Sequence, residues 1–300
     1  MNYNTISISV VWKLFRPHTL TASFVPVLIG TAVAWKATRQ LDWTLFVAML
    51  VASILIQAAT NTFNEYFDHV SGLDNADSMG IAGVITQDRV PPKMVFYIAV
   101  ATFATAMLLG VYICARSSWW LAPIGAACML VGYLYNGGPI PISATPFGEI
   151  FAGGVMGTGI ILLASFIQQK AVHLDDVLIS IPVTVLIGCI LTSNNIRDLE
   201  NDRENGRRTL AIYLGHKWAV RFLAFSLFFA NLWVVLLVRL GIVSAWAFLA
   251  FGSLWPAYLA IRKFRGERTI PDMMTGLMHV AQTNTAFGIL FLVGLLVGAA

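Results

Sequence analysis

Two short polar segments of this 300-residue chain carry asparagine and aspartate four residues apart. The pairs are Asn64 with Asp68 and Asn194 with Asp198, and Asp202 continues the second series. Residues i and i+4 share one face of a helix, so each pair would present its oxygens in one direction. Carboxylate and amide oxygens suit Mg²⁺, which proteins usually hold through one or two carboxylates together with substrate phosphates. The segments therefore predict sites for Mg²⁺ and a diphosphate. The alternative interpretation is that these residues are solvated helix ends without a binding role.

Basic residues near these segments suit the chemistry of an allylic diphosphate. Such a molecule ionises when positioned charge neutralises its leaving group. Arg197 is the strongest candidate for a diphosphate contact, because it lies between Asn194 and Asp198. For Arg16, a membrane-interface anchor and a contact to diphosphate or to an acceptor carboxylate are equally supported. The remaining candidates for substrate contacts, most of which the topological charge bias also explains, are Lys93 and Arg207.

Aromatic residues could stabilise the carbocation that such an ionisation leaves behind, because their faces attract cations. The chain has 19 Phe, 9 Trp and 8 Tyr. Most of these are expected to be ordinary packing or lipid-facing residues. Tyr133 and Tyr135 are better placed than most, at the predicted cytoplasmic end of an apolar span.

The elements that must position these residues are long apolar helices. Apolar residues make up 58% of the chain and charged residues 11%, against about 45–50% and 25% in soluble domains. A bilayer core of roughly 30 Å needs about 20 apolar residues per helix. We therefore expect an all-α membrane bundle of about nine transmembrane helices, forming a single domain over residues 1–300. The expected spans are Pro17–Trp35, Trp43–Phe63, Val95–Cys114, Trp119–Asn136, Gly148–Ile167, Leu178–Ile196, Ala219–Val238, Ser244–Ile261 and Thr275–Val297.

The fifth of these spans is rich in glycine, and we interpret it as a tightly packed helix because small residues let membrane helices approach closely. The two Asn-x-x-x-Asp pairs lie 130 residues apart, each after an apolar span. This correspondence suggests two pseudo-repeated halves that each place one polar cluster at the same membrane face.

The distribution of basic residues predicts the orientation. With the N-terminus in the cytoplasm, 14 of the 19 lysines and arginines fall on the cytoplasmic side, as the positive-inside rule requires. Both polar segments then face the cytoplasm. The net charge of +4 reflects this topology and gives no reason to expect nucleic acid as a partner.

At these residues the sequence resembles the UbiA superfamily of intramembrane aromatic prenyltransferases, and within it the branch that acts on 1,4-dihydroxy-2-naphthoate. The resemblance covers nearly the whole chain. It is carried by Arg16–Leu20, Val25–Gly30, Asn64–Asp68 with Gly72 and Asp74, Tyr133–Pro141, and Asn194–Asp198 with Asp202, Gly206 and Thr209-Leu210.

The resemblance implies a bundle with a central cavity that opens toward membrane lipid. It also implies transfer of a polyprenyl chain from its diphosphate to the naphthoate with loss of CO₂, giving demethylmenaquinone for menaquinone biosynthesis. Mg²⁺ would be bound by Asn64, Asp68, Asp74, Asp198 and Asp202. The residues expected to act in catalysis are Asp68, Asp198, Arg197 and Tyr135; Asn194, Arg16, Lys93, Tyr133 and Arg207 are expected to bind substrate.

The sequence departs from the commonest superfamily pattern after Asp68. Gly72 stands where a second Asp usually follows, and the next carboxylates are Asp74 and Asp77. This spacing resembles the naphthoate branch, and it leaves open which of the two participates. The segment 137–145 has no charge, which weakens assignment to the 4-hydroxybenzoate or haem branches.

Two alternatives remain at this point. One is a superfamily relative with another aromatic acceptor, such as 4-hydroxybenzoate. The other is a secondary transporter, whose internal repeats could look similar but whose polar residues should lie mid-span in broken helices. Here the polar residues gather at one predicted membrane face, which argues against transport.

Overall fold

The computed structural model describes residues 7–73 and 83–298, and these residues form helices and connecting turns without any strand. Asp74 and Asp77 lie outside the described residues. The first part contains α1 (Ile8–Phe15), α2 (Thr21–Thr38), α3 (Trp43–Val70), α4 (Pro92–Arg116) and α5 (Leu121–Asn136). The second part contains α6 (Gly148–Phe151), α7 (Ile160–Gln169), α8 (Leu174–Arg197), α9 (Leu199–Glu204), α10 (Leu210–Arg239), α11 (Leu254–Arg265) and α12 (Ile270–Val297).

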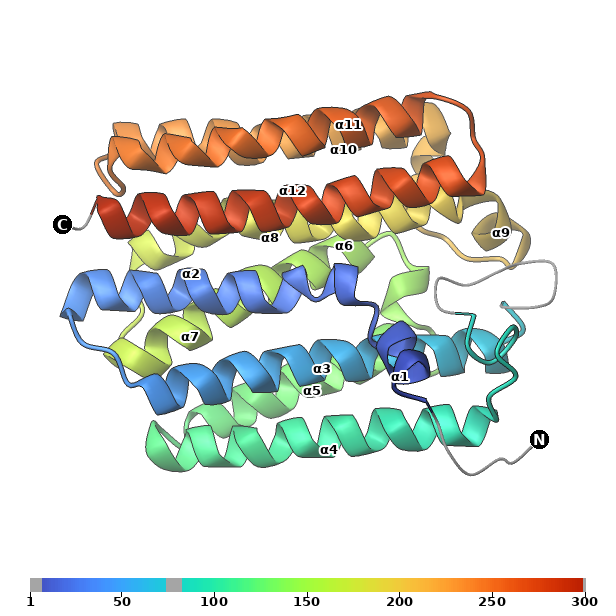
Figure 1. The fold of residues 1–300 in the computed structure, drawn as a ribbon, viewed down its shortest axis with the longest axis horizontal. Coiled ribbons are helices and arrows are strands. Elements are labelled where there is room, and N and C mark those ends of the chain that lie inside the picture. The colour runs from blue at the N-terminus through green and yellow to red at the C-terminus, as the bar shows by residue number, and fades with distance from the viewer. Residues whose placement is uncertain (1–6, 74–82, 299–300) are drawn as a thin grey trace.

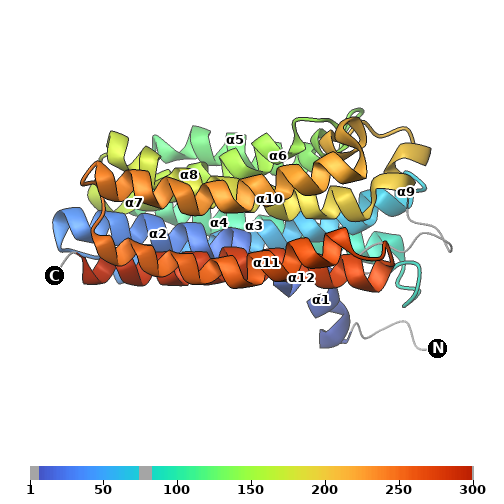
Figure 2. The same ribbon diagram turned by 90° about the horizontal axis from the view of Figure 1, so that it is seen from above.

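The long helices lie side by side along the longest axis of the molecule (Figures 1 and 2). Within the described residues, six helices are long and apolar enough to cross a membrane: α3, α4, the continuous stretch Gly148–Gln169, α8, α10 and α12. The protein is therefore a multi-pass membrane protein, as the composition predicted. α2 qualifies as a seventh span only together with the preceding helical segment, from which it is bent by 56°. α5 has 16 residues and is shorter than the six.

The helical segment before α2 is interrupted at Arg16, which adopts a left-handed conformation with φ 48°. This conformation is costly for a residue with a Cβ. It ends α1 and lets a short 3₁₀ turn, η1 (Pro17–Thr19), begin with proline at its first position. Because Pro17 has no N–H to leave unpaired, it fits the first turn of a helix.

The predicted fifth span is confirmed as helical and closely packed, and its middle is a π-helical segment, η3 (Ala152–Gly159). Gly153 and Gly157 lie very close to the backbone of α8. A Cβ added at Gly153 would lie 2.5 Å from the carbonyl oxygen of Thr184, and one added at Gly157 would lie 2.6 Å from the Cα of Thr184. The hydroxyl of Thr158 also lies 2.7 Å from that of Thr184. Glycine is thus required here by the approach of two backbones.

Replacing Gly157 by alanine should destabilise the protein by about 1–3 kcal/mol, because the methyl group overpacks a rigid contact. Gly154 provides a matched control in the same segment, since a Cβ there meets nothing within 4 Å. Gly154→Ala should be neutral or stabilising by up to about 1 kcal/mol, the usual cost of glycine in a helix. Thermal unfolding in detergent micelles checks this, and equal midpoints for the two variants would contradict the packing argument.

The largest apolar core lies among α2, α8, α10, α11 and α12, and includes the fully buried rings of Phe264, Phe287 and Phe291. A second cluster joins α2, α3, α4 and α7. α5 belongs to neither core except through its first residues, Leu121 and Ala122. A cavity lies between α5 and these clusters.

Candidate active site

The two predicted polar segments lie at the same end of the bundle, where α3 and α8 both finish (Figure 1). Asp68 is in the last turn of α3, and Asp198 joins α8 to α9. A carboxylate near a helix C-terminus faces the negative end of the helix dipole, which is unfavourable. This cost applies to Asp68, whereas Asp198 also occupies the N-cap of the short helix α9; both aspartates are paired with arginines.

Arg207 compensates the first segment and links it to the second. Its guanidinium lies 2.8 Å from Asp68 Oδ1 and 3.4 Å from Asp202 Oδ1. The local chain directs it there: Gly206 has a left-handed φ of 75°, and the Arg207 amide donates to the carbonyl of Asp202 at 2.9 Å. Glycine is the residue that takes this conformation without steric cost. The turn after α9 thus returns a cation to the end of α3.

Arg197 compensates Asp198. Its Nε donates to Asp198 Oδ1 at 2.6 Å, and the arginine side chain is only 8% exposed. The residue predicted to contact the diphosphate is thus paired with a predicted metal ligand. Asn194, one helical turn earlier, has a buried Oδ1 with no hydrogen-bond partner in the described part of the chain.

Asp202, in α9, is almost fully enclosed. Its pKa is raised to about 7, chiefly by burial and also by the nearby carboxylates of Asp198 and Asp68, while the positive charge of Arg207 opposes the change. Bringing several carboxylates into one place makes each harder to ionise. Such a cluster gains most from a bound cation.

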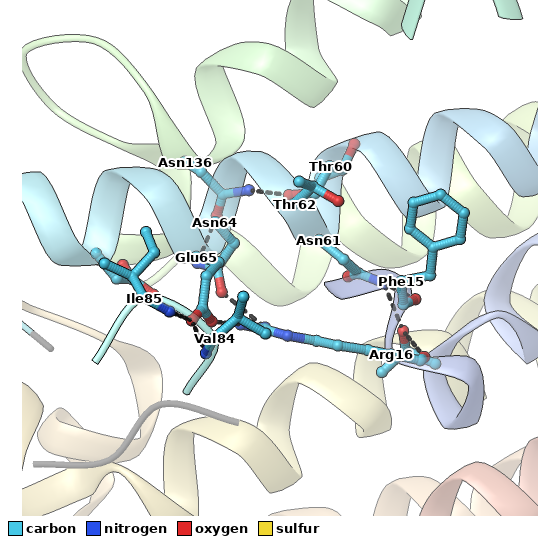
Figure 3. A network of polar contacts seen from close by, with 12 residues as sticks. Phe15, Arg16, Thr60, Asn61, Thr62, Asn64, Glu65, Val84, Ile85 and Asn136 are labelled. Atoms are coloured by element: carbon cyan, nitrogen blue, oxygen red, sulfur yellow. Dashed lines mark hydrogen bonds and ion pairs between the residues drawn. The ribbon is translucent and has the colours of Figure 1, made fainter. Parts of the chain in front are cut away.

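A third arginine reaches the same place from the N-terminal segment (Figure 3). Arg16 Nη1 donates to Asn64 Oδ1 at 2.7 Å. Asn64 Nδ2 donates to Asn136 Oδ1 at 3.1 Å, and Asn136 Nδ2 donates to the carbonyl of Thr60 at 3.1 Å. The network joins α1, α3 and the end of α5.

These polar groups line one end of a cavity of about 420 Å³. Away from them the lining is mostly apolar and continues between α3, α4, α5, η3, α7 and α8, with residues such as Met49, Ile113 and Leu163. The cavity thus combines a charged end with a long apolar remainder. That shape fits a molecule with an anionic head and a hydrocarbon tail.

The residues present fit Mg²⁺. The donor set is oxygen only, and the oxygen of Asn194 has no other partner among the described residues. Within the same residues, no three His, Cys, Asp or Glu side chains gather closely enough to hold an ion alone. Mg²⁺ is usually bound by one or two carboxylates with phosphates and waters completing its shell. The arrangement therefore suits a metal that is bound together with a diphosphate.

The structure brings nine of the predicted site residues to this cavity. They are Arg16, Asn64, Asp68, Tyr135, Asn194, Arg197, Asp198, Asp202 and Arg207. Lys93 is exposed and lies beside Tyr66 and His69, away from the cavity lining. Tyr133 packs its ring against Phe63 and Phe67, at 5.6 and 5.7 Å between centroids, and does not line the cavity.

Four asparagines that line the cavity were not singled out from the sequence: Asn61, Asn136, Asn195 and Asn201. Asn195 donates to Glu149 Oε1 at 2.9 Å. Adjacent positions could have signalled three of them, since Asn195 follows Asn194 and Asn136 follows Tyr135. Asn201 likewise precedes the predicted metal ligand Asp202.

Comparison with known proteins matches this chain to prenyltransferases. The model of the UbiA prenyltransferase family matches residues 23–273. A 1,4-dihydroxy-2-naphthoate octaprenyltransferase of Bacillus subtilis is 50% identical over 288 residues, covering 96% of this chain and 92% of the relative. The enzyme of the same name from Mycobacterium leprae is 28% identical over 93% of this chain and 95% of its own length.

Among solved structures, a UbiA homolog from Archaeoglobus fulgidus bound to DMAPP and Mg²⁺ superimposes with a TM-score of 0.60 at 15% identity. The alignment covers 93% of this chain and 99% of that chain. At this identity the likeness concerns the fold. Taken with the match over residues 23–273 and the 50% identical relative, it establishes that the chain belongs to the UbiA prenyltransferase family.

Proposed function

We propose that this protein transfers a polyprenyl chain from its diphosphate to 1,4-dihydroxy-2-naphthoate with loss of CO₂. The observation that carries the proposal is the cavity, whose charged end and apolar remainder match the head and tail of a prenyl diphosphate. The choice of acceptor is supported by the 50% identical relative named for that reaction.

The reaction breaks the C–O bond between the prenyl group and the diphosphate and forms a C–C bond to the ring carbon that bears the carboxyl group. The carboxyl group leaves as CO₂, and the electron pair of its C–C bond restores the aromatic ring. Inorganic diphosphate takes the negative charge of the leaving group. The product is the quinol form of demethylmenaquinone, so the transfer itself needs no oxidant.

In this reaction, the cationic side chains and the oxygen-bearing side chains of the cavity would have different roles. Arg197 and Arg207 would neutralise the diphosphate as it leaves, and the oxygens of Asn64, Asp68, Asp198 and Asp202 would hold Mg²⁺. When bound, Mg²⁺ supplies further positive charge at the leaving oxygens. Tyr135 lines the same cavity and would offer its ring to the prenyl cation.

We further propose that nine spans in two pseudo-repeated halves cross the membrane, with the N-terminus and the charged end of the cavity at the cytoplasm. The excess of basic residues at this end supports the orientation. Under this topology α5 and the segment Ala245–Arg265 also span the bilayer. Ser71 follows the last residue of α3 and Arg116 is the last residue of the next helix, α4, so the two lie on opposite sides of the membrane under this topology. Single cysteines introduced at the two positions, in a chain without its native cysteines, would test it in intact cells: an impermeant thiol reagent should label position 116 and not position 71.

Acceptor selectivity tests the function directly. The purified protein with Mg²⁺ and a polyprenyl diphosphate should prenylate 1,4-dihydroxy-2-naphthoate and leave 4-hydroxybenzoate unchanged in a mixture of equal concentrations. Product should be identified by mass spectrometry. Preferential prenylation of 4-hydroxybenzoate would replace the naphthoate assignment with another branch of the family.

A further inference from the structure

A buried carboxylate that the reaction does not require lies next to the charged end of the cavity. Glu65, in α3, is 1% exposed and does not line the cavity. A buried carboxylate is costly unless it is paired and hydrogen-bonded. Its partners therefore indicate why it is there.

Those partners come from two other parts of the chain (Figure 3). Glu65 Oε1 accepts hydrogen bonds from the backbone amides of Val84 at 2.6 Å and Ile85 at 3.3 Å. Glu65 Oε2 lies 3.5 Å from Arg16 Nη2. One side chain thus ties α3 to the segment before α4 and to the bend that follows α1.

Arg16 is the partner that reaches the substrate cavity. It is 7% exposed, lines the cavity and donates to Asn64 through Nη1. Its Nε is buried and has no hydrogen-bond partner in residues 7–73 and 83–298. A donor that remains unpaired while the rest of the guanidinium is fixed is available to an anion that enters the site.

The backbone of Arg16 is fixed from the same face of α3. Asn61 Nδ2 donates to the carbonyl of Phe15 at 2.8 Å and to Thr19 Oγ1 at 2.9 Å. These bonds flank the left-handed residue on both sides. Strained backbone of this kind persists where surrounding contacts determine it, and it is common at functional sites.

We propose that Glu65 is a positioning residue that fixes the guanidinium of Arg16 for binding of the substrate diphosphate. Glu65 itself does not touch the substrate. Arg16 would meet the diphosphate with its side chain already ordered, which reduces the entropy lost on binding. The inference rests on the proposed diphosphate chemistry of the cavity and adds a residue to it.

A double-mutant cycle tests the proposal. Glu65→Gln keeps an oxygen that accepts from Val84 and removes the charge that holds Arg16. Arg16→Asn removes the guanidinium, and asparagine tolerates the left-handed conformation. Binding of inorganic diphosphate with Mg²⁺ is measured by calorimetry on the full-length protein in micelles, without any acceptor.

Each single variant should weaken diphosphate binding by about tenfold, the scale of a hydrogen bond to a charged group. The double variant should bind no more weakly than Arg16→Asn alone, because Glu65 acts through Arg16. Glu65→Asp should restore part of the affinity. Independent, multiplying losses, or unchanged affinity in Glu65→Gln, would overturn the proposal.

Further variants and measurements distinguish a loss of Arg16 positioning from a general folding defect, and the role of Glu65 from the proposed reaction. Asp88→Asn breaks the exposed Lys13–Asp88 pair, which also joins α1 to the segment before α4, and should leave diphosphate affinity unchanged. If Glu65→Gln does not fold, Glu65→Asp combined with Arg16→Asn completes the cycle under the same criterion. Coupling in diphosphate binding without naphthoate product would refute the proposed acceptor and leave the role of Glu65 standing.

Discussion

Asp198→Asn is expected to lower the rate of prenyl transfer by about 10²–10³-fold, the usual loss when one group that stabilises transition-state charge is removed. Asp198 lines the charged end of the cavity and is paired with Arg197 at 2.6 Å. The amide keeps the size of the side chain and removes the negative charge that Mg²⁺ requires. The rate should be measured at saturating Mg²⁺ and prenyl diphosphate.

Glu200→Gln is the matched control for this substitution. Glu200 lies two residues later in α9, is largely exposed and pairs with Arg203 of the same helix at 3.1 Å. It loses the same charge outside the cavity, so activity should stay within about twofold, since exposed pairs contribute little. Equal losses in the two variants would show that general electrostatics, rather than a site at Asp198, causes the effect.

Arg207→Gln is expected to change the requirements for metal and substrate in opposite directions. Arg207 holds a positive charge between Asp68 and Asp202. Without it, the carboxylates should bind Mg²⁺ more tightly, because a like charge no longer competes. The diphosphate loses a cationic partner, so its KM should rise by about tenfold.

Titrations of activity against Mg²⁺ and against prenyl diphosphate measure the two effects separately. Arg203→Gln, which removes an exposed arginine from α9, should leave both unchanged. A variant of Arg207 that needs more Mg²⁺ than the wild type would contradict the bridging role. The same variant should also unfold at lower temperature without Mg²⁺, because two enclosed carboxylates lose their cation.

The sequence predicted the helical membrane fold, the family and most of the polar lining. Apolar runs and i, i+4 spacing are local properties, so Asn64 with Asp68 and Asn194 with Asp198 could be recognised from position alone. Arg197 was singled out by position too, because it lies between Asn194 and Asp198; its role as a diphosphate contact stays a prediction. The glycine-rich span was also correctly interpreted, because small residues have a direct packing meaning in membrane helices.

What the sequence could not provide are contacts between distant segments. Arg207 meets Asp68 across 139 positions, and Arg16 meets Asn64 across 48. No spacing rule pairs such residues before the bundle is assembled. Glu65 was passed over for the same reason: it adjoins Asn64 in sequence, yet its role depends on the amides of Val84 and Ile85.

Tyr133 and Lys93 were predicted to bind substrate, and the structure does not place them in the cavity lining. Both lie near the polar motifs in sequence, and neither lines the cavity in the structure. Tyr133 and Tyr135 are two residues apart on a helix, so they cannot share a face. Only Tyr135 lines the cavity, and the roles proposed for the two tyrosines therefore differ in their structural support.

Stoichiometric release of CO₂ tests the central claim most directly. The purified protein should be given 1,4-dihydroxy-2-naphthoate labelled in its carboxyl group, a polyprenyl diphosphate and Mg²⁺. We predict one labelled CO₂ for each prenylated product, with both abolished by chelation of Mg²⁺ and restored by its readdition. Prenylated product that retains the labelled carboxyl group, or product formed at the same rate with the metal removed, would contradict the proposed reaction.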